Sequence, residues 1–179
     1  MTPVQKAFSS SLIAALAMVA PAAAAPQVVC RSFSTKIKAV SLPGNHNIFA
    51  RFQLDTPNLQ VLMSTTVIVG GPGQSCLVAD LSALTRITDN YVVYQVRVDG
   101  VPMEGQVGGW AGVADPVVPV LFDDPDEQLV DPFRILSYNF FRQVSPGKHL
   151  VEVMVAAGSN VVAGLEPQVV SPVLTLHFR

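Results

Sequence analysis

Short runs of alternating apolar and polar residues recur along most of the chain. The clearest run is residues 92–98, where Val92, Tyr94, Val96 and Val98 form one face. A period of two is typical of a β-strand with one buried side. Asp99-Gly100 follows directly, and this dipeptide is typical of a two-residue β-hairpin turn.

Strand-like patterns in other parts of the chain predict eight further strands. They are expected at residues 33–39, 48–54, 61–69, 76–81, 117–122, 133–143, 148–156 and 174–178. Pro119 lacks a backbone N–H, so the strand that contains it is expected at a sheet edge. No window shows sustained helical spacing. We therefore expect an all-β fold, a single antiparallel β-sandwich of eight or nine strands, with jelly-roll and immunoglobulin-like topologies both open.

The first 25 residues follow a different pattern. Lys6 supplies a positive charge, residues 12–19 an apolar core, and residues 22–25 a run of alanines. This order predicts a secretory signal peptide at residues 1–25, followed by a β-sandwich domain at residues 26–179. The apolar core is far shorter than the roughly 20 residues of a spanning helix, although an uncleaved anchor is the alternative. The mature protein is expected to be secreted or periplasmic, with no membrane span.

Composition narrows the classes of function. Cleavage would remove one of the eleven basic residues and none of the thirteen acidic ones, leaving a net charge of −3. A nucleic-acid-binding surface needs a basic patch, which this balance does not predict. Half of the residues are hydrophobic and 13% are charged, so the chain is not of the disordered class. Fourteen prolines and twelve glycines favour many turns.

The chain contains two cysteines, Cys30 and Cys76. In an exported protein such a pair predicts one disulfide. A metal-binding or redox pair is the competing reading, but it would show a short cysteine spacing. We therefore expect a structural bridge between Cys30 and Cys76.

Trp110 is the candidate ligand-binding residue. It lies in the glycine-rich stretch GQVGGWAG at residues 105–112, between predicted strands. An exposed tryptophan on such a loop offers a flat apolar face and a polar N–H, which suit a sugar ring or a partner protein. The alternative is that Trp110 folds back and covers one end of the sandwich.

Metal and cofactor sites are not expected. Acidic residues cluster between the predicted strands at 117–122 and 133–143, at Asp123, Asp124, Asp126, Glu127 and Asp131. Their spacing differs from a calcium-binding EF-hand loop, and a solvated loop beside an edge strand is the preferred interpretation. His46, His149 and His177 are too widely spaced for the short ligand pairs common in zinc sites. We expect neither a metal nor a cofactor.

Catalytic motifs are also missing from the sequence. Residues 73–76 (GQSC) come nearest to a nucleophile elbow, but the closing glycine is absent. A Ser/His/Asp triad assembled from distant residues stays open, because its members need not be close in sequence.

Three segments carry a family resemblance: SCLV at residues 75–78, VDG at 98–100 and PGKHLV at 146–151. They resemble secreted bacterial β-sandwich proteins of unassigned function. The resemblance implies a fold and no catalytic residue. We predict an exported, non-catalytic binding module for a glycan, an envelope component or a protein, with a small secreted hydrolase as the alternative. Oligomerisation through an apolar face that includes Leu150 and Met154 also stays open.

Overall fold

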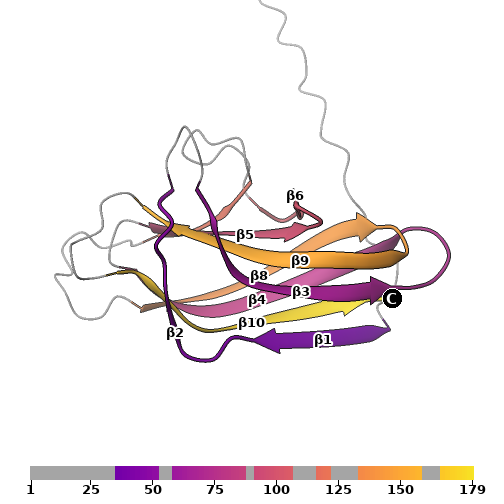
Figure 1. The fold of residues 1–179 in the computed structure, drawn as a ribbon, viewed down its shortest axis with the longest axis horizontal. Helices are drawn as coiled ribbons and strands as arrows, with labels where there is room; N and C mark the ends of the chain where they lie inside the picture. The colour runs from indigo at the N-terminus through magenta and orange to yellow at the C-terminus, as the bar shows by residue number, and fades with distance from the viewer. Residues whose placement is uncertain (1–34, 53–57, 88–90, 107–115, 122–132, 159–165) are drawn as a thin grey trace, which may run out of the picture.

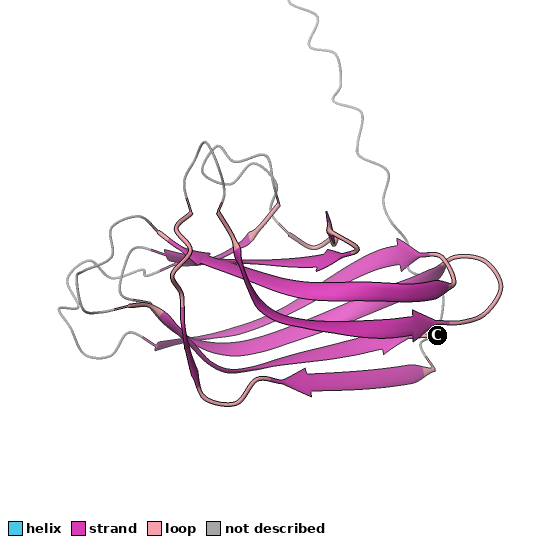
Figure 2. Cartoon of the chain, viewed as in Figure 1, coloured by secondary structure: helices cyan, strands magenta, loops and turns pink. Residues whose placement is uncertain are grey.

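Two antiparallel β-sheets, one stacked on the other, make up the described part of the chain in a computed structural model (Figures 1 and 2). The structure describes residues 35–52, 58–87, 91–106, 116–121, 133–158 and 166–179. These stretches contain ten strands and no helix, which confirms the predicted all-β sandwich. A helix able to cross a membrane is accordingly not found within them. The predicted signal peptide at residues 1–25 lies outside the described residues.

Each sheet contains five strands. In the first sheet the order is β1 (Lys36–Ser41), β10 (Gln168–Phe178), β4 (Ser75–Arg86) and β8 (Phe133–Val144), and β2 (Asn45–Asn47) also pairs with β10. In the second sheet the order is β3 (Gln60–Val69), β9 (Gly147–Ala157), β5 (Tyr91–Val98) and β6 (Val101–Pro102), and β7 (Val118–Leu121) also pairs with β5.

The strand pairings are nested along the chain. The first strand pairs with the last, β3 pairs with β9, and β4 pairs with β8. Two further pairings, β10 with β4 and β9 with β5, complete the sheets. This is the arrangement of a long hairpin rolled up across two layers, which is a jelly roll. The topology that the strand count left open is therefore the jelly roll.

Alternating side chains fill the space between the sheets. In β5, Val92, Tyr94, Val96 and Val98 are all at most 2% exposed, which confirms the predicted inward face. The expectation of a single buried side is wrong for this strand, because Val93 and Gln95 on the other face are buried as well. The hydroxyl of Tyr94 lies 2.6 Å from that of Thr85 on β4, so these two buried hydroxyls satisfy each other. Burial raises the pKa of Tyr94 far above its usual range, which keeps the phenol neutral.

The turn between β5 and β6 has the predicted geometry. Asp99 and Gly100 have φ values of 52° and 77°, and Val98 pairs with Val101 across them. Two successive positive φ values are those of a type I′ turn, which matches the twist of the flanking strands. The two-residue hairpin at Asp99-Gly100 is confirmed.

The predicted strand at residues 48–54 is only partly right. Ile48, Ala50 and Phe52 are buried, as the alternation predicted, with exposures of 0%, 7% and 1%. However, the described residues 48–52 form no regular strand and make only isolated bridges, including one between Arg51 and Ala157. The reason is that this segment passes from one sheet to the other. Pro119, by contrast, lies in β7, which pairs only with β5 among the described strands, so its edge position is confirmed.

One side of the sandwich is closed by backbone contacts. The residue Glu104, just after β6, exchanges two hydrogen bonds with Phe141 of β8, with N···O distances of 2.8 and 3.2 Å. The neighbouring Gly105 has a φ of 95°, and a Cβ atom there would lie 2.8 Å from the Asn139 carbonyl oxygen.

On the other side of the sandwich, the side-chain Nζ of Lys38 on β1 donates to the Thr66 carbonyl of β3 at 2.8 Å. On this side, β1 and β2 of the first sheet therefore face β3 of the second sheet. The candidate site lies between these edges.

Candidate functional site

A shallow hollow of about 350 Å³ lies between β2 and the start of β3. Because β2 belongs to the first sheet and β3 to the second, the hollow spans the edges of both layers. Seven residues line it: Asn45, His46, Asn47, Phe49, Gln60, Val61 and Leu62. None of these residues carries a permanent charge.

Phe49 is the exposed aromatic residue of this hollow. Before it, Ile48 donates its backbone N–H to the Pro167 carbonyl at 2.8 Å, beside the first sheet. After it, the Ala50 carbonyl accepts the N–H of Ala157 at 3.0 Å, in the second sheet. Phe49 thus occupies the crossing point between two anchored neighbours. Both neighbours are buried, whereas Phe49 is 67% exposed.

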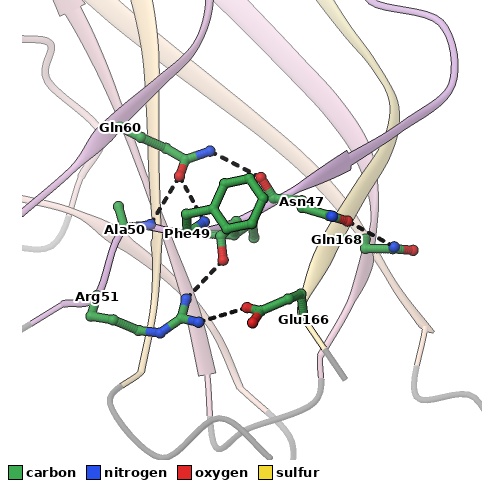
Figure 3. Close-up of polar contacts among 8 residues, drawn as sticks. Asn47, Phe49, Ala50, Arg51, Gln60, Glu166 and Gln168 are labelled. Carbon is green, nitrogen blue, oxygen red and sulfur yellow. Dashed lines mark hydrogen bonds and ion pairs between the residues drawn. The ribbon is translucent and has the colours of Figure 1, made fainter. Parts of the chain in front are cut away.

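Gln60 holds the crossing segment in place (Figure 3). Its side-chain Oε1 accepts the backbone N–H groups of Phe49 and Ala50 at 2.8 and 2.9 Å. Its Nε2 donates to the Asn47 carbonyl at 3.1 Å. One amide side chain therefore satisfies two main-chain N–H groups of a segment that has left the sheet, and also bonds to the last residue of β2.

Arg51 anchors the same segment from the opposite direction (Figure 3). One guanidinium nitrogen donates to the Ile48 carbonyl at 2.7 Å, and the other lies 2.6 Å from Glu166 Oε2. The side chains of this ion pair are 26% and 35% exposed, so solvent screens the pair and its direct contribution to stability is small. Beside the hollow, the Arg51 guanidinium and the Glu166 carboxylate therefore neutralise each other.

The remaining polar atoms of the hollow can serve a ligand. Asn47 accepts a hydrogen bond from Gln168 through Oδ1 at 2.9 Å, which leaves its Nδ2 group as a donor. The His46 Nε2 lies 3.3 and 3.2 Å from the carbonyls of Leu42 and Pro43. Carbonyls only accept, so Nε2 carries the proton and Nδ1 is left as an acceptor in the neutral ring. An apolar ring face with donors and acceptors around it is the chemistry that a sugar ring needs.

Comparison with solved structures gives remote matches. No family model matches the sequence, and no curated protein matches it. Among solved structures it is similar to the C-terminal domain of EclA, a sugar-binding protein, at 10% identity and a TM-score of 0.40, over 87% of this chain and 86% of that chain. It is also similar to VP2 of the infectious bursal disease virus subviral particle, at 11% identity and a TM-score of 0.38, over 82% of this chain and 33% of that chain. At these TM-scores the likenesses carry no argument about function.

Most residues singled out from the sequence lie outside the described residues. Trp110 falls within residues 107–115, the acidic cluster within 122–132, and Cys30 within 1–34. Cys76 is described: it opens β4 beside Ser75 and is 5% exposed. The Trp110 site and the Cys30–Cys76 bridge therefore stay predictions. Of the histidines, only His46 lines the hollow.

Phe49 and Gln60 were not predicted as site residues. Phe49 had a signal in the sequence, because it is an aromatic residue on the side of the 48–54 run opposite Ile48 and Ala50. Gln60 had none, since its three hydrogen bonds depend on how the segment crosses between the sheets. Within the described residues, no three His, Cys, Asp or Glu side chains gather closely enough to hold a metal ion.

Two histidines pair with aspartates elsewhere in the sandwich. His177 Nε2 lies 2.9 Å from Asp80 Oδ2, and His149 Nδ1 lies 2.7 Å from Asp99 Oδ2. The other ring nitrogen of His149 faces the Ser145 backbone carbonyl at 2.8 Å. Among the described residues, no hydroxyl is hydrogen-bonded to either ring. Neither pair therefore forms a Ser/His/Asp triad with them.

The His149 ring instead joins two turns of the fold. Both of its nitrogens face oxygen acceptors, and only the doubly protonated imidazolium can donate to both. Burial alone lowers the pKa of His149, but the hydrogen bonds to Asp99 and Ser145 and the charge of Asp99 together raise it above its usual value. The hydrogen bond from His149 likewise lowers the pKa of Asp99. Asp99 also accepts the Leu150 N–H at 2.9 Å.

We expect this pair to make stability depend on pH. A histidine whose pKa is raised on folding contributes fully below about pH 6.5 and loses that contribution as the pH rises through its folded pKa. The free energy of unfolding should therefore fall as the pH rises above about 6.5, and urea titrations at several pH values measure it. His149→Gln should flatten this slope, whereas His177→Gln should keep it because the pair between His149 and Asp99 is intact. Equal slopes in the wild type and His149→Gln would contradict the imidazolium assignment.

Proposed function

We propose that the protein is an exported, non-catalytic binding module that holds a saccharide in the hollow around Phe49. One observation carries the proposal: Phe49 is 67% exposed between two buried neighbours, on a segment fixed by hydrogen bonds to Gln60. An exposed aromatic residue on a fixed segment loses little conformational freedom when a ligand covers it. Preorganised apolar surface of this kind favours binding.

The polar rim supports a saccharide as the ligand. A sugar ring presents an apolar C–H face and hydroxyl groups at its edge. The Phe49 ring suits the face, while Asn47 Nδ2 and His46 Nδ1 suit the hydroxyls as donor and acceptor. Ligand pockets commonly combine an apolar wall with a few placed polar groups in this way.

Export belongs to the same proposal. It is supported by the sequence pattern of residues 1–25, which predicts a cleaved signal peptide. An exported module meets glycans at the cell envelope or beyond it. Trp110 stays a separate proposed ligand contact, and only the sequence supports it.

The proposal is tested with Phe49→Ala. Covering a Phe side chain contributes about 1.5–3 kcal/mol, so the variant should bind at least about tenfold more weakly than the wild type. A glycan array selects the ligand, and isothermal titration calorimetry measures both affinities. Ile68→Ala is the matched control, because Ile68 is 68% exposed on β3 but does not line the hollow. Equal losses in both variants, or no glycan bound by the wild type, would refute the proposal.

A further inference from the structure

We infer that the hollow selects uncharged saccharides over their anionic counterparts; the inference rests on the proposed function. None of the seven lining residues carries a permanent positive charge that could bind a carboxylate or sulfate. Proteins that recognise such groups commonly use arginine, whose guanidinium forms two parallel hydrogen bonds to a carboxylate. The hollow offers amides, an imidazole and an aromatic ring instead.

Arg51, the described cation that follows the lining residue Phe49 by two positions, is already committed. Arg51 bonds to the Ile48 carbonyl and to Glu166, so an anionic ligand would have to compete with an existing carboxylate. Arg86 lies further away. It pairs in register with Gln168, which in turn pairs with Asn47, so two strand spacings of roughly 5 Å each separate it from the hollow.

The acceptor on His46 gives a second reason why the hollow should disfavour an anionic saccharide. In the neutral ring, Nδ1 has a lone pair available, because the two carbonyls of Leu42 and Pro43 hold the proton on Nε2. A sugar hydroxyl can donate to Nδ1, whereas a carboxylate oxygen cannot. An anionic group placed there would also lose water without gaining a cation, which is unfavourable.

The experiment compares sugars that differ in one group. The probes are oligomers of glucose, galactose and mannose, and the corresponding oligomers of glucuronate, galacturonate and mannuronate, measured by calorimetry at low and high salt. We expect at least one neutral oligomer to bind with an affinity that salt changes less than twofold, and its uronate to bind at least tenfold more weakly. Val61→Arg adds a cation at a rim position that is 51% exposed, and it should raise the affinity for the uronate relative to that for the neutral oligomer, so that the ratio of the two affinities falls at least threefold.

The outcomes separate the two claims. A uronate that binds the wild type as tightly as its neutral counterpart, through Phe49, would overturn the inference and leave the proposed function standing. If no oligomer of either kind binds and the array is also empty, the proposed function fails, and the inference fails with it. Failure of Val61→Arg to improve uronate binding relative to neutral binding would show that charge is not what excludes the anion, and would also overturn the inference.

Discussion

Cys30→Ser is expected to lower the free energy of unfolding by about 4 kcal/mol under oxidising conditions. The predicted bridge to Cys76 would close a loop of some 45 residues in the unfolded chain, and the entropy that this removes accounts for the estimate. For a domain of about 150 residues, such a loss should lower the melting temperature by more than 10 °C.

The described strands around Cys76 are compatible with the predicted bridge to Cys30. The Thr35 N–H donates to the Phe178 carbonyl at 3.0 Å, which fixes the start of β1 beside β10. On the other side of β10, His177 pairs with Val78, so Cys76 lies about two strand spacings, or roughly 10 Å, from β1. Cys30 lies five positions before Thr35 along the chain, and an extended chain covers about 3.3 Å per residue. The bridge therefore requires no rearrangement of the sheets.

Comparison of variants distinguishes the bridge from the loss of a buried side chain. Cys76→Ser and the double variant should unfold like Cys30→Ser, because removal of either sulfur breaks the same bond. Wild-type protein melted in reductant should match all three. A Cys30→Ser protein with the wild-type melting temperature would show that no bridge forms.

The all-β fold could be predicted because apolar and polar residues alternate with a period of two in several runs of the sequence, although parts of β4, β5 and β9 are buried on both faces. The inward face of β5 and the turn at Asp99-Gly100 are local properties that short windows of sequence contain. The jelly-roll topology could not be predicted in the same way. It depends on which strands pair, and the pairing of Lys36 with Phe178 joins the two ends of the domain. No local pattern distinguishes that partner from another strand with the same alternation.

The candidate site was harder still to predict from the sequence, because it also depends on contacts between distant segments. Phe49 could have been found as an aromatic residue on the outward side of an alternating run, but outward aromatics are common on sandwich surfaces. What distinguishes it is the crossing between the sheets, where Ile48 bonds beside one layer and Ala50 in the other. Trp110 was predicted as a ligand contact because it is the single tryptophan of the chain and lies in a glycine-rich stretch, which is a property of composition. Composition shows that a residue is unusual, whereas only the fold shows which atoms surround it.

The second large effect is expected at Gln60. Gln60→Ala removes three hydrogen bonds to main-chain groups of the crossing segment and of β2. The bond to Ala50 is partly buried, whereas the bonds to Phe49 and Asn47 are exposed and water can replace them, so the free energy of unfolding should fall by about 1–2 kcal/mol. Loss of the bond to the Ala50 N–H should cost the most free energy, because Ala50 is only 7% exposed and little water can replace the lost acceptor. Hydrogen exchange should show faster exchange of the Phe49 and Ala50 amides.

Graded variants identify which atoms of Gln60 matter. Gln60→Glu keeps an oxygen acceptor for the two N–H groups but loses the donor to the Asn47 carbonyl, so its stability should lie between the wild type and Gln60→Ala. Gln168→Ala removes only one side-chain hydrogen bond, to Asn47, and should cost about 1 kcal/mol or less. Saccharide affinity should follow the same order, because a segment that is no longer fixed must be ordered again when the ligand binds. Gln60→Ala with the stability and amide exchange of Gln168→Ala would mean that the crossing segment is held by Arg51 and its flanking anchors alone.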